Sequence, residues 1–201
     1  RRTTAIEPKG RKQFMQIICI SGGGSNRTKA LAGRTAHKLG YKSLNREDLV
    51  EEAIKEGERA IELNPNGAEA YACLVLVLIY SDETELAIKL IKKALRLNPI
   101  PPPHYYFWLA ATYRIRGQYE KAIQHLKKAL IGSPDLLTPY LYLTASYSSL
   151  NRIEEAHKAA EEVLRIEPNF SLEYHKNILP YKNQETLNQY IDALRNAGLP
   201  D

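Results

Sequence analysis

The sequence has few residues of the kinds that build metal, disulfide and nucleophilic sites. Its 201 residues include two cysteines, Cys19 and Cys73, and each lies in an apolar run far from the other. No Cys-x-x-Cys and no Gly-x-Ser-x-Gly occurs, and the five histidines never stand at metal-ligand spacing. We therefore expect no metal, no cofactor and no catalytic residues. Two buried, reduced cysteines would be typical of a cytoplasmic protein.

Long apolar runs and clustered charge are also missing. The longest apolar run, Tyr71 to Tyr80, has ten residues, whereas a membrane helix needs roughly 18 or more. The 28 basic and 23 acidic residues leave a net charge of +5, without a basic stripe interleaved with aromatics. We therefore expect no membrane span and no nucleic-acid partner. Because the chain begins Arg1-Arg2 and its single methionine is Met15, residues 1–14 are interpreted as a basic, disordered leader or upstream scar.

An internal repeat accounts for most of the chain. Four prolines, Pro65, Pro99, Pro134 and Pro168, follow one another at spacings of 34, 35 and 34 residues. Small residues recur twelve and five positions before each proline: Ala53 and Ala60, Ala87 and Ala94, Ala122 and Ala129, Ala156 and Val163. Within each unit, apolar positions recur at three- and four-residue steps. This pattern predicts pairs of amphipathic helices that cross closely at the small residues.

An aromatic residue also opens the later units, at Tyr71, Tyr106 and Tyr140, and a leucine follows three residues later. Together these marks resemble the tetratricopeptide repeat, a helix–turn–helix unit of about 34 residues. Full units match at 68–101, 103–136 and 137–170, within a repeat region of 58–170, while Gly57 stands where a large apolar residue is expected. The resemblance implies an all-α superhelical stack of helical hairpins, an α-solenoid, because one hairpin cannot bury its apolar face alone.

In proteins of this family the first helix of each unit lines a concave face. The resemblance implies a partner-binding groove made of Leu76, Ile79, Tyr80, His104, Phe107, Ala111, Arg114, Ile115, Leu141 and Ala145. Family members that bind acidic C-terminal peptides carry Lys, Arg and Asn at places that are apolar here. We therefore expect the groove to bind an apolar helix or extended segment of a partner protein. The alternative is that the chain's own termini fill it.

Residues 171–201 are expected to form capping helices for the last repeat. Ser171 to Leu179 predicts a short helix before Pro180, and Gln184 to Asn196 has an amphipathic pattern that ends near Gly198. The string from Phe170 to Asp201 resembles the C-terminal tails of bacterial class III adenylate cyclase-like proteins with tetratricopeptide repeats. This resemblance implies a bacterial signalling origin. It does not imply cyclase activity, because the catalytic domain is absent from this chain.

A glycine-rich segment, residues 15–57, precedes the repeats. Met15 to Ser21 predicts a short strand, Gly22 to Arg27 a turn, and Thr28 to Leu39 a helix. A strand, a glycine loop and a helix in this order can present backbone N–H groups to phosphate. The candidate phosphate-binding residues are Gly23, Gly24, Ser25, Arg27 and Thr28. The loop nevertheless departs from the P-loop motif, since no Gly-Lys-Ser/Thr follows at the required place.

The same segment, including Leu39-Gly40-Tyr41 and Asn45 to Leu49, resembles the start of cytidylate kinase-like proteins. Three interpretations stay open: a non-catalytic remnant, a helix that packs on the repeats, and a functional phosphate site. The nucleotide-binding arm, lid and further strands of such a kinase do not fit before the repeats begin. We therefore expect a non-enzymatic interaction scaffold of bacterial signalling. The alternative is a cytidylate kinase-like phosphotransferase with accessory repeats.

Overall fold

The computed structural model describes residues 46–201, which form helices joined by short loops. The helices are α2 (Arg46–Leu63), α3 (Ala68–Tyr80), α4 (Thr84–Leu97), α5 (Pro103–Ile115), α6 (Tyr119–Leu130), α7 (Leu137–Ser149), α8 (Ile153–Ile166), α9 (Leu172–Ile178) and α10 (Gln184–Asn196). No strand occurs within this range, and none of its helices combines the length and the apolar character that a membrane span requires. The strand, glycine loop and helix predicted before residue 40 lie outside the described residues.

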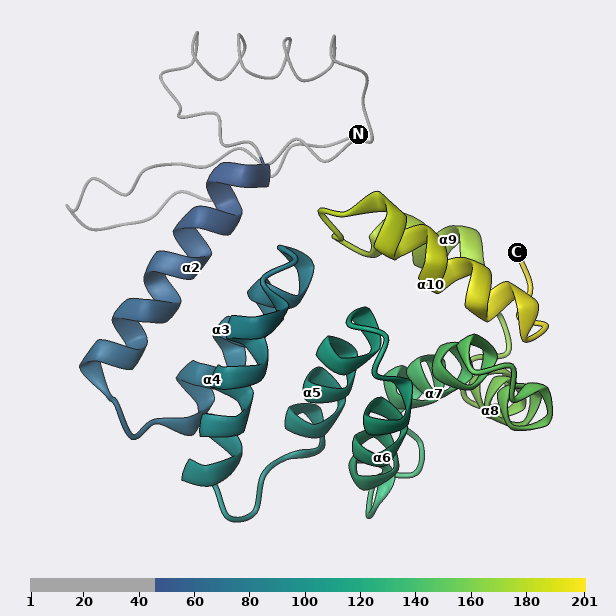
Figure 1. Cartoon of the computed structure of the whole chain (residues 1–201), viewed down its shortest axis with the longest axis horizontal. Helices are drawn as coiled ribbons and strands as arrows, with labels where there is room; N and C mark the ends of the chain where they lie inside the picture. The colour runs from purple at the N-terminus through teal and green to yellow at the C-terminus, as the bar shows by residue number, and fades with distance from the viewer. Residues whose placement is uncertain (1–45) are drawn as a thin grey trace, which may run out of the picture. The chain divides into compact units, whose positions relative to one another are not determined.

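Three helical hairpins, α3–α4, α5–α6 and α7–α8, stack next to one another (Figure 1). At their crossings the small residues of the second helices are fully buried, each 0% exposed: Ala87, Ala94, Ala122, Ala129, Ala156 and Val163. Small side chains allow two helix axes to approach closely. The predicted crossing points are therefore confirmed in these three hairpins.

Each hairpin reverses through one residue in the left-handed backbone region. These residues are Asp82 (φ 70°), Gly117 (φ 69°) and Asn151 (φ 54°). After α5, the Gln118 N–H donates to the Tyr113 carbonyl at 2.8 Å, which satisfies a carbonyl that the helix end leaves free. Glycine and asparagine adopt this conformation at low cost, so Gly117 and Asn151 suit the places where their helices end.

The first described helix, α2, follows the same pattern with one difference. Ala53 and Ala60 occupy the places of the fully buried alanines, yet both are exposed. No helix among the described residues covers them. On its other side α2 touches α3, where a Cβ at Gly57 would lie 3.0 Å from Leu74 Cδ1. The departure of Gly57 from the repeat pattern thus has a packing reason, because a larger residue would collide with Leu74.

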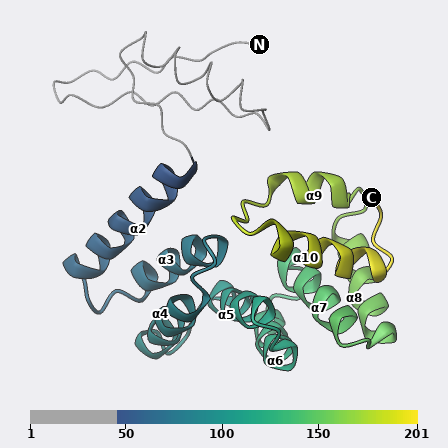
Figure 2. The ribbon, with the colours of Figure 1, turned by 45° about the horizontal axis from the view of Figure 1, so that its top comes forward.

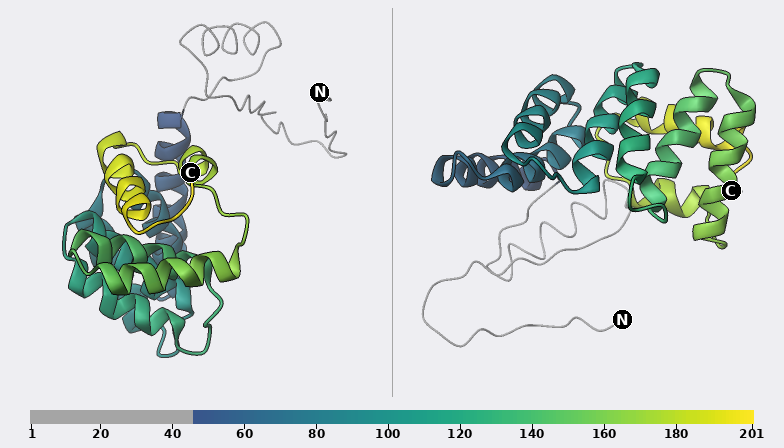
Figure 3. Two further views of the ribbon diagram at one scale, coloured as in Figure 1. Left: turned by 90° about the vertical axis from the view of Figure 1, so that its right-hand side faces the viewer. Right: turned by 90° about the horizontal axis from the view of Figure 1, so that it is seen from below.

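The two helices predicted for the tail are present as α9 and α10. Ser171 Oγ accepts a hydrogen bond from the Tyr174 N–H, and Asn183 Oδ1 accepts from the N–H groups of Glu185 and Thr186, so both helices have side-chain N-caps. Their position differs from the expected terminal cap. α10 packs against α7, on the inner side of the arc of hairpins (Figures 2 and 3).

The apolar face of α10 explains this position. Leu187, Tyr190, Ile191 and Leu194 are all buried, and they recur at helical steps along one side of the helix. α7 offers a surface of matching character through Leu141, Tyr142 and Ala145. The tail therefore covers α7, the first helix of the last hairpin, on the concave side. It does not cover the outer end of the last hairpin, where a terminal cap was expected.

The burial of His175 makes stability depend on pH. His175 lies between the rings of Phe170 and Tyr190, with centroid distances of 5.3 and 5.9 Å, and burial lowers its pKa to about 4. Between pH 6.5 and 4 the unfolded chain binds a proton at this residue and the folded chain does not. We expect the free energy of unfolding to fall by about 1–3 kcal/mol as pH drops through this window.

Urea denaturation at several pH values tests this expectation, with His175→Gln beside the wild type. The free energy of unfolding of the wild type should fall toward that of His175→Gln as pH falls. The reason is that only the wild type has an imidazole whose protonation the folded state suppresses. His157→Gln, at an exposed histidine, is the control and should follow the wild type. Parallel curves for wild type and His175→Gln would contradict the prediction.

Candidate functional site

The concave face is formed by α3, α5 and α7, the first helices of the three hairpins. The ten predicted groove residues differ in how much of their surface is exposed. The buried ones are Ile79, Ala111, Arg114, Leu141 and Ala145; the half-buried ones are Tyr80, His104, Phe107 and Ile115; and Leu76 is exposed. Five of the ten predicted residues are thus buried in the folded chain, and the other five keep some exposed surface.

Arg114 is the centre of the buried part. Its side chain is buried, and Nη2 donates a hydrogen bond to the Tyr181 hydroxyl at 2.9 Å. The guanidinium carbon lies 4.3 Å from the ring centroid of Tyr190 and 5.4 Å from that of Tyr142. No ion pair of the described residues involves Arg114. Aromatic faces, not a carboxylate, therefore stabilise this buried cation.

Two of these tyrosines, Tyr142 and Tyr190, stay neutral. Burial raises the pKa of Tyr142 and of Tyr190 well above the usual phenol range. Burial is also the main reason why the pKa of Tyr80 is raised to about 12. Since an arginine side chain stays protonated in proteins, the cluster holds one fixed positive charge among neutral rings.

The tail continues from this cluster to the C-terminal end of α3. The ring of Tyr181 meets that of Tyr80 edge-on, at 5.1 Å between centroids and 84° between planes. The Lys182 N–H donates to the Tyr80 carbonyl at 2.9 Å, and Asn183 Nδ2 donates to Asp82 Oδ2 at 3.4 Å. The chain's own tail therefore occupies this part of the concave face, which is the alternative that the sequence left open.

The accessible part lies toward the N-terminal ends of α3 and α5; we call it the open half and define it as Glu69, Cys73, Leu76, His104 and Phe107. The Tyr105 hydroxyl donates to Glu69 Oε2 at 2.8 Å, and His104 Nε2 lies 3.5 Å from Glu69 Oε1. These contacts join α3 to α5 beside the half-buried ring of Phe107. Burial, followed by the bond to Glu69, raises the pKa of Tyr105 to about 12, so this hydroxyl remains a donor.

Cys73 corrects one expectation from the sequence. It was expected to be buried, but it is exposed, and its thiol lies 3.7 Å from Glu69 Oε1. Glu69, Cys73 and Leu76 follow one another at four- and three-residue steps, so they share the open side of α3. Burial is the first cause that raises the pKa of the Cys73 thiol, and the nearby Glu69 carboxylate raises it further. This thiol is consequently not activated as a nucleophile.

A ring cluster borders the open half. The chain's single tryptophan, Trp108, lies 4.5 Å from His104 and 6.0 Å from Phe107 between ring centroids. Sequence reasoning did not name Trp108, Tyr142, Tyr181 or Tyr190 as site residues. Tyr142 lies within a repeat unit, where tyrosines fit the repeat pattern. Tyr181 carried a usable signal, since it follows Pro180 in a loop where no repeat position requires an aromatic residue.

The structure brings no metal-binding cluster of histidine, cysteine or carboxylate side chains together in the range it describes. Gly23, Gly24, Ser25, Arg27 and Thr28, the candidate phosphate-binding residues, lie outside that range. The concave face combines apolar and aromatic side chains on helices with a few hydrogen-bonding groups at its edge.

Comparisons with known proteins agree with this architecture. A family model of the tetratricopeptide repeat matches residues 113–176. The chain is 24% identical to TPR repeat-containing protein YpiA of Bacillus subtilis (strain 168) over 167 residues, which is 82% of this chain and 38% of YpiA. This chain thus spans well under half the length of that relative.

Solved structures of tetratricopeptide proteins share the fold. The crystal structure of MamA superimposes with a TM-score of 0.56 at 20% identity, covering 82% of this chain and 91% of MamA. YrrB, described as a TPR protein with an unusual peptide-binding site, gives a TM-score of 0.53 at 17% identity, covering 82% and 80%. The fold implied by the repeat is therefore confirmed, whereas these matches lend no support to the cyclase-like and kinase-like resemblances.

The bond between Arg114 and Tyr181 predicts how strongly the tail is held. Tyr181→Phe keeps the ring and removes the hydroxyl that accepts from Arg114. We expect the free energy of unfolding, measured in urea, to fall by about 1–3 kcal/mol, because a buried charged donor loses its partner. Tyr174→Phe is the matched control in the same tail, since Tyr174 is 69% exposed. Equal losses in the two variants would show that the bond contributes nothing.

Proposed function

We propose that this chain is a protein-interaction module that binds an apolar helix or extended segment of a partner protein in the open half. One observation carries the proposal. The concave face of a helical stack keeps an exposed Leu76 and a partly exposed Phe107 side chain next to a part that an apolar segment already fills. Extended concave surfaces of stacked repeats are the surfaces that such proteins use for binding.

The chain's own tail is a guide to what the face accepts. It presents Tyr181 and the apolar side of α10 to the concave helices, and it adds a main-chain hydrogen bond from Lys182 to Tyr80. A partner segment with one aromatic and several aliphatic side chains would match the open half in the same way. No arginine or lysine belongs to the open half, so a partner carboxylate has no cation to bind there.

Solved structures of the same fold support peptide binding as a class of activity. YrrB is described as having a peptide-binding site, and that statement concerns YrrB. For this chain, membership of a bacterial cytoplasmic signalling system is part of the proposal and rests on the tail resemblance. The kinase-like alternative has no observation in its favour among the described residues.

Selection from a random-peptide phage library tests the proposal, because such a library samples partner segments of every composition. We expect the wild type to enrich peptides rich in aromatic and aliphatic residues. Phe107→Ala should weaken binding of a selected peptide by about tenfold or more, since a central aromatic contact is worth about 2 kcal/mol or more. The fluorescence of Trp108, 6.0 Å from Phe107, provides the titration signal.

Ile131→Ala is the matched control, because Ile131 is a 78% exposed apolar side chain in the loop after α6. It should leave the affinity unchanged. Selected peptides that bind Phe107→Ala and the wild type equally would place the binding surface elsewhere and contradict the proposal.

A further inference from the structure

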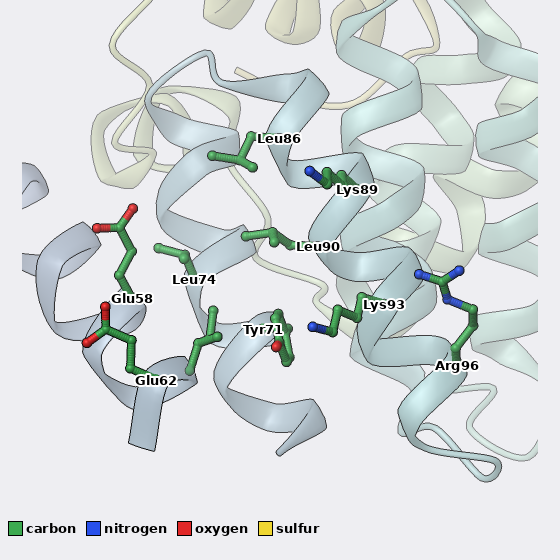
Figure 4. Close-up of a pocket in the computed structure, with 10 residues that line it drawn as sticks. Glu58, Glu62, Tyr71, Leu74, Leu86, Lys89, Leu90, Lys93 and Arg96 are labelled. Atoms are coloured by element: carbon green, nitrogen blue, oxygen red, sulfur yellow. The ribbon is translucent and has the colours of Figure 1, made fainter. Parts of the chain in front are cut away.

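A second surface lies away from the concave face, in a groove bounded by α2, α3 and α4. Its volume is about 610 Å³. Figure 4 shows acidic side chains on the α2 side, basic side chains on the α4 side, and apolar side chains between them. None of the ten predicted concave-face residues lines it, so this surface is separate from the one proposed above.

The floor of the groove is apolar. Leu74 of α3 and Leu90 of α4 form its base together with Ile61 of α2, and Leu86 of α4 stands at its upper edge with 40% of its surface exposed. α2 touches α3 at Gly57, opposite Leu74. Beyond this contact, described residues of α2 and α4 line the two sides of the groove. A trough between two helices, with aliphatic side chains at its base, has the shape into which a third helix packs.

The two rims carry opposite charge. Glu58 and Glu62 lie one turn apart on α2, and Lys89, Lys93 and Arg96 follow one another along α4. Among the described residues no ion pair joins the rims or neutralises any of these five side chains. Lys93 does have a neighbour, since its Nζ lies 4.4 Å from the centre of the Tyr71 ring. The charges are thus available to a molecule that lies between them.

We propose that this groove binds one amphipathic helix of a partner protein, which has acidic residues along one edge and basic residues along the other. Its apolar face lies on Leu74, Leu86 and Leu90. Its acidic edge faces the basic rim of α4, and its basic edge faces Glu58 and Glu62. Charges one turn apart on the partner match charges one turn apart on α2 and α4, because all three elements are helices.

The opposed rims also fix the direction of the bound helix. Turning a helix end for end, with its apolar face kept down, exchanges its two edges. A helix with unlike edges therefore matches the rims in one direction only, whereas a helix with like edges meets one rim of its own charge in both. The groove distinguishes partners by the distribution of charge across the helix, not by its net charge.

Three synthetic helical peptides test this proposal against the full chain by isothermal titration. They share one leucine face and differ at the edges: one edge glutamate and one lysine, both glutamate, or both lysine. We expect the mixed peptide to bind the wild type about fivefold or more tighter than either other peptide, since each exposed ion pair contributes about 0.2–1 kcal/mol. Non-specific attraction to a chain of net charge +5 would favour the all-glutamate peptide, so that ranking would overturn the proposal.

Charge reversal of one rim gives the sharper result. Glu58→Lys with Glu62→Lys makes both rims basic, and the preference should then change to the all-glutamate peptide. Leu86→Glu should weaken all peptides, whereas Phe107→Ala on the concave face should change none of them. If the double variant keeps the wild-type ranking, or if Phe107→Ala alone lowers affinity, the groove is not the binding site. The Phe107→Ala arm also keeps this test distinct from that of the open half.

Discussion

A helical hairpin of this sequence has more apolar surface than it can bury by itself, and the rest of the structure follows from that constraint. Inside the stack the excess is covered by the neighbouring hairpin, which is why the alanines at the crossings of α3–α4, α5–α6 and α7–α8 are fully buried. The ends and the concave side have no such neighbour. There the surface must be covered by other parts of the chain, covered by a partner, or left exposed.

On the concave side the tail covers part of this apolar surface, and it does so with polar contacts as well as apolar ones. Arg114 donates to Tyr181 and lies against Tyr190, so a buried cation on α5 depends on side chains of the tail for its hydrogen bond and for the nearer of its two ring contacts. Removal of the tail would leave that charge with the Tyr142 ring of α7 alone. In the observed position Tyr181 brings its hydroxyl to Arg114 and its ring to Tyr80 at once, and this combination favours one register of the tail.

The sequence was sufficient for the repeated features and insufficient for the single ones. The alanine spacing and the helix ends at Gly117 and Asn151 follow local rules that act at each repeat, so they could be predicted from residue type and position. The two tail helices occur once, but their start and stop residues follow equally local rules. The location of α10 could not, because it depends on the match between two distant apolar faces. The burial of Arg114 depends on that same location, because Tyr181 and Tyr190 of the tail contact its guanidinium. The exposure of Cys73 likewise follows from no local pattern.

The two accessible surfaces differ in the physical basis of their selectivity. The open half has Leu76 and Phe107 beside one carboxylate that is already bound to Tyr105, so affinity there must come from shape and from burial of apolar area. The groove beside α2 has a comparable apolar floor, but its rims bear five charges that no ion pair among the described residues neutralises. Burial of apolar area can bind many amphipathic helices in this groove. The charges on the rims then determine which helix binds more tightly and in which direction it lies. A stack of similar repeats thus has two different surfaces, because its tail covers one part of the concave face and Gly57 lets α2 lie close to Leu74 of α3, beside the charged rim of α4.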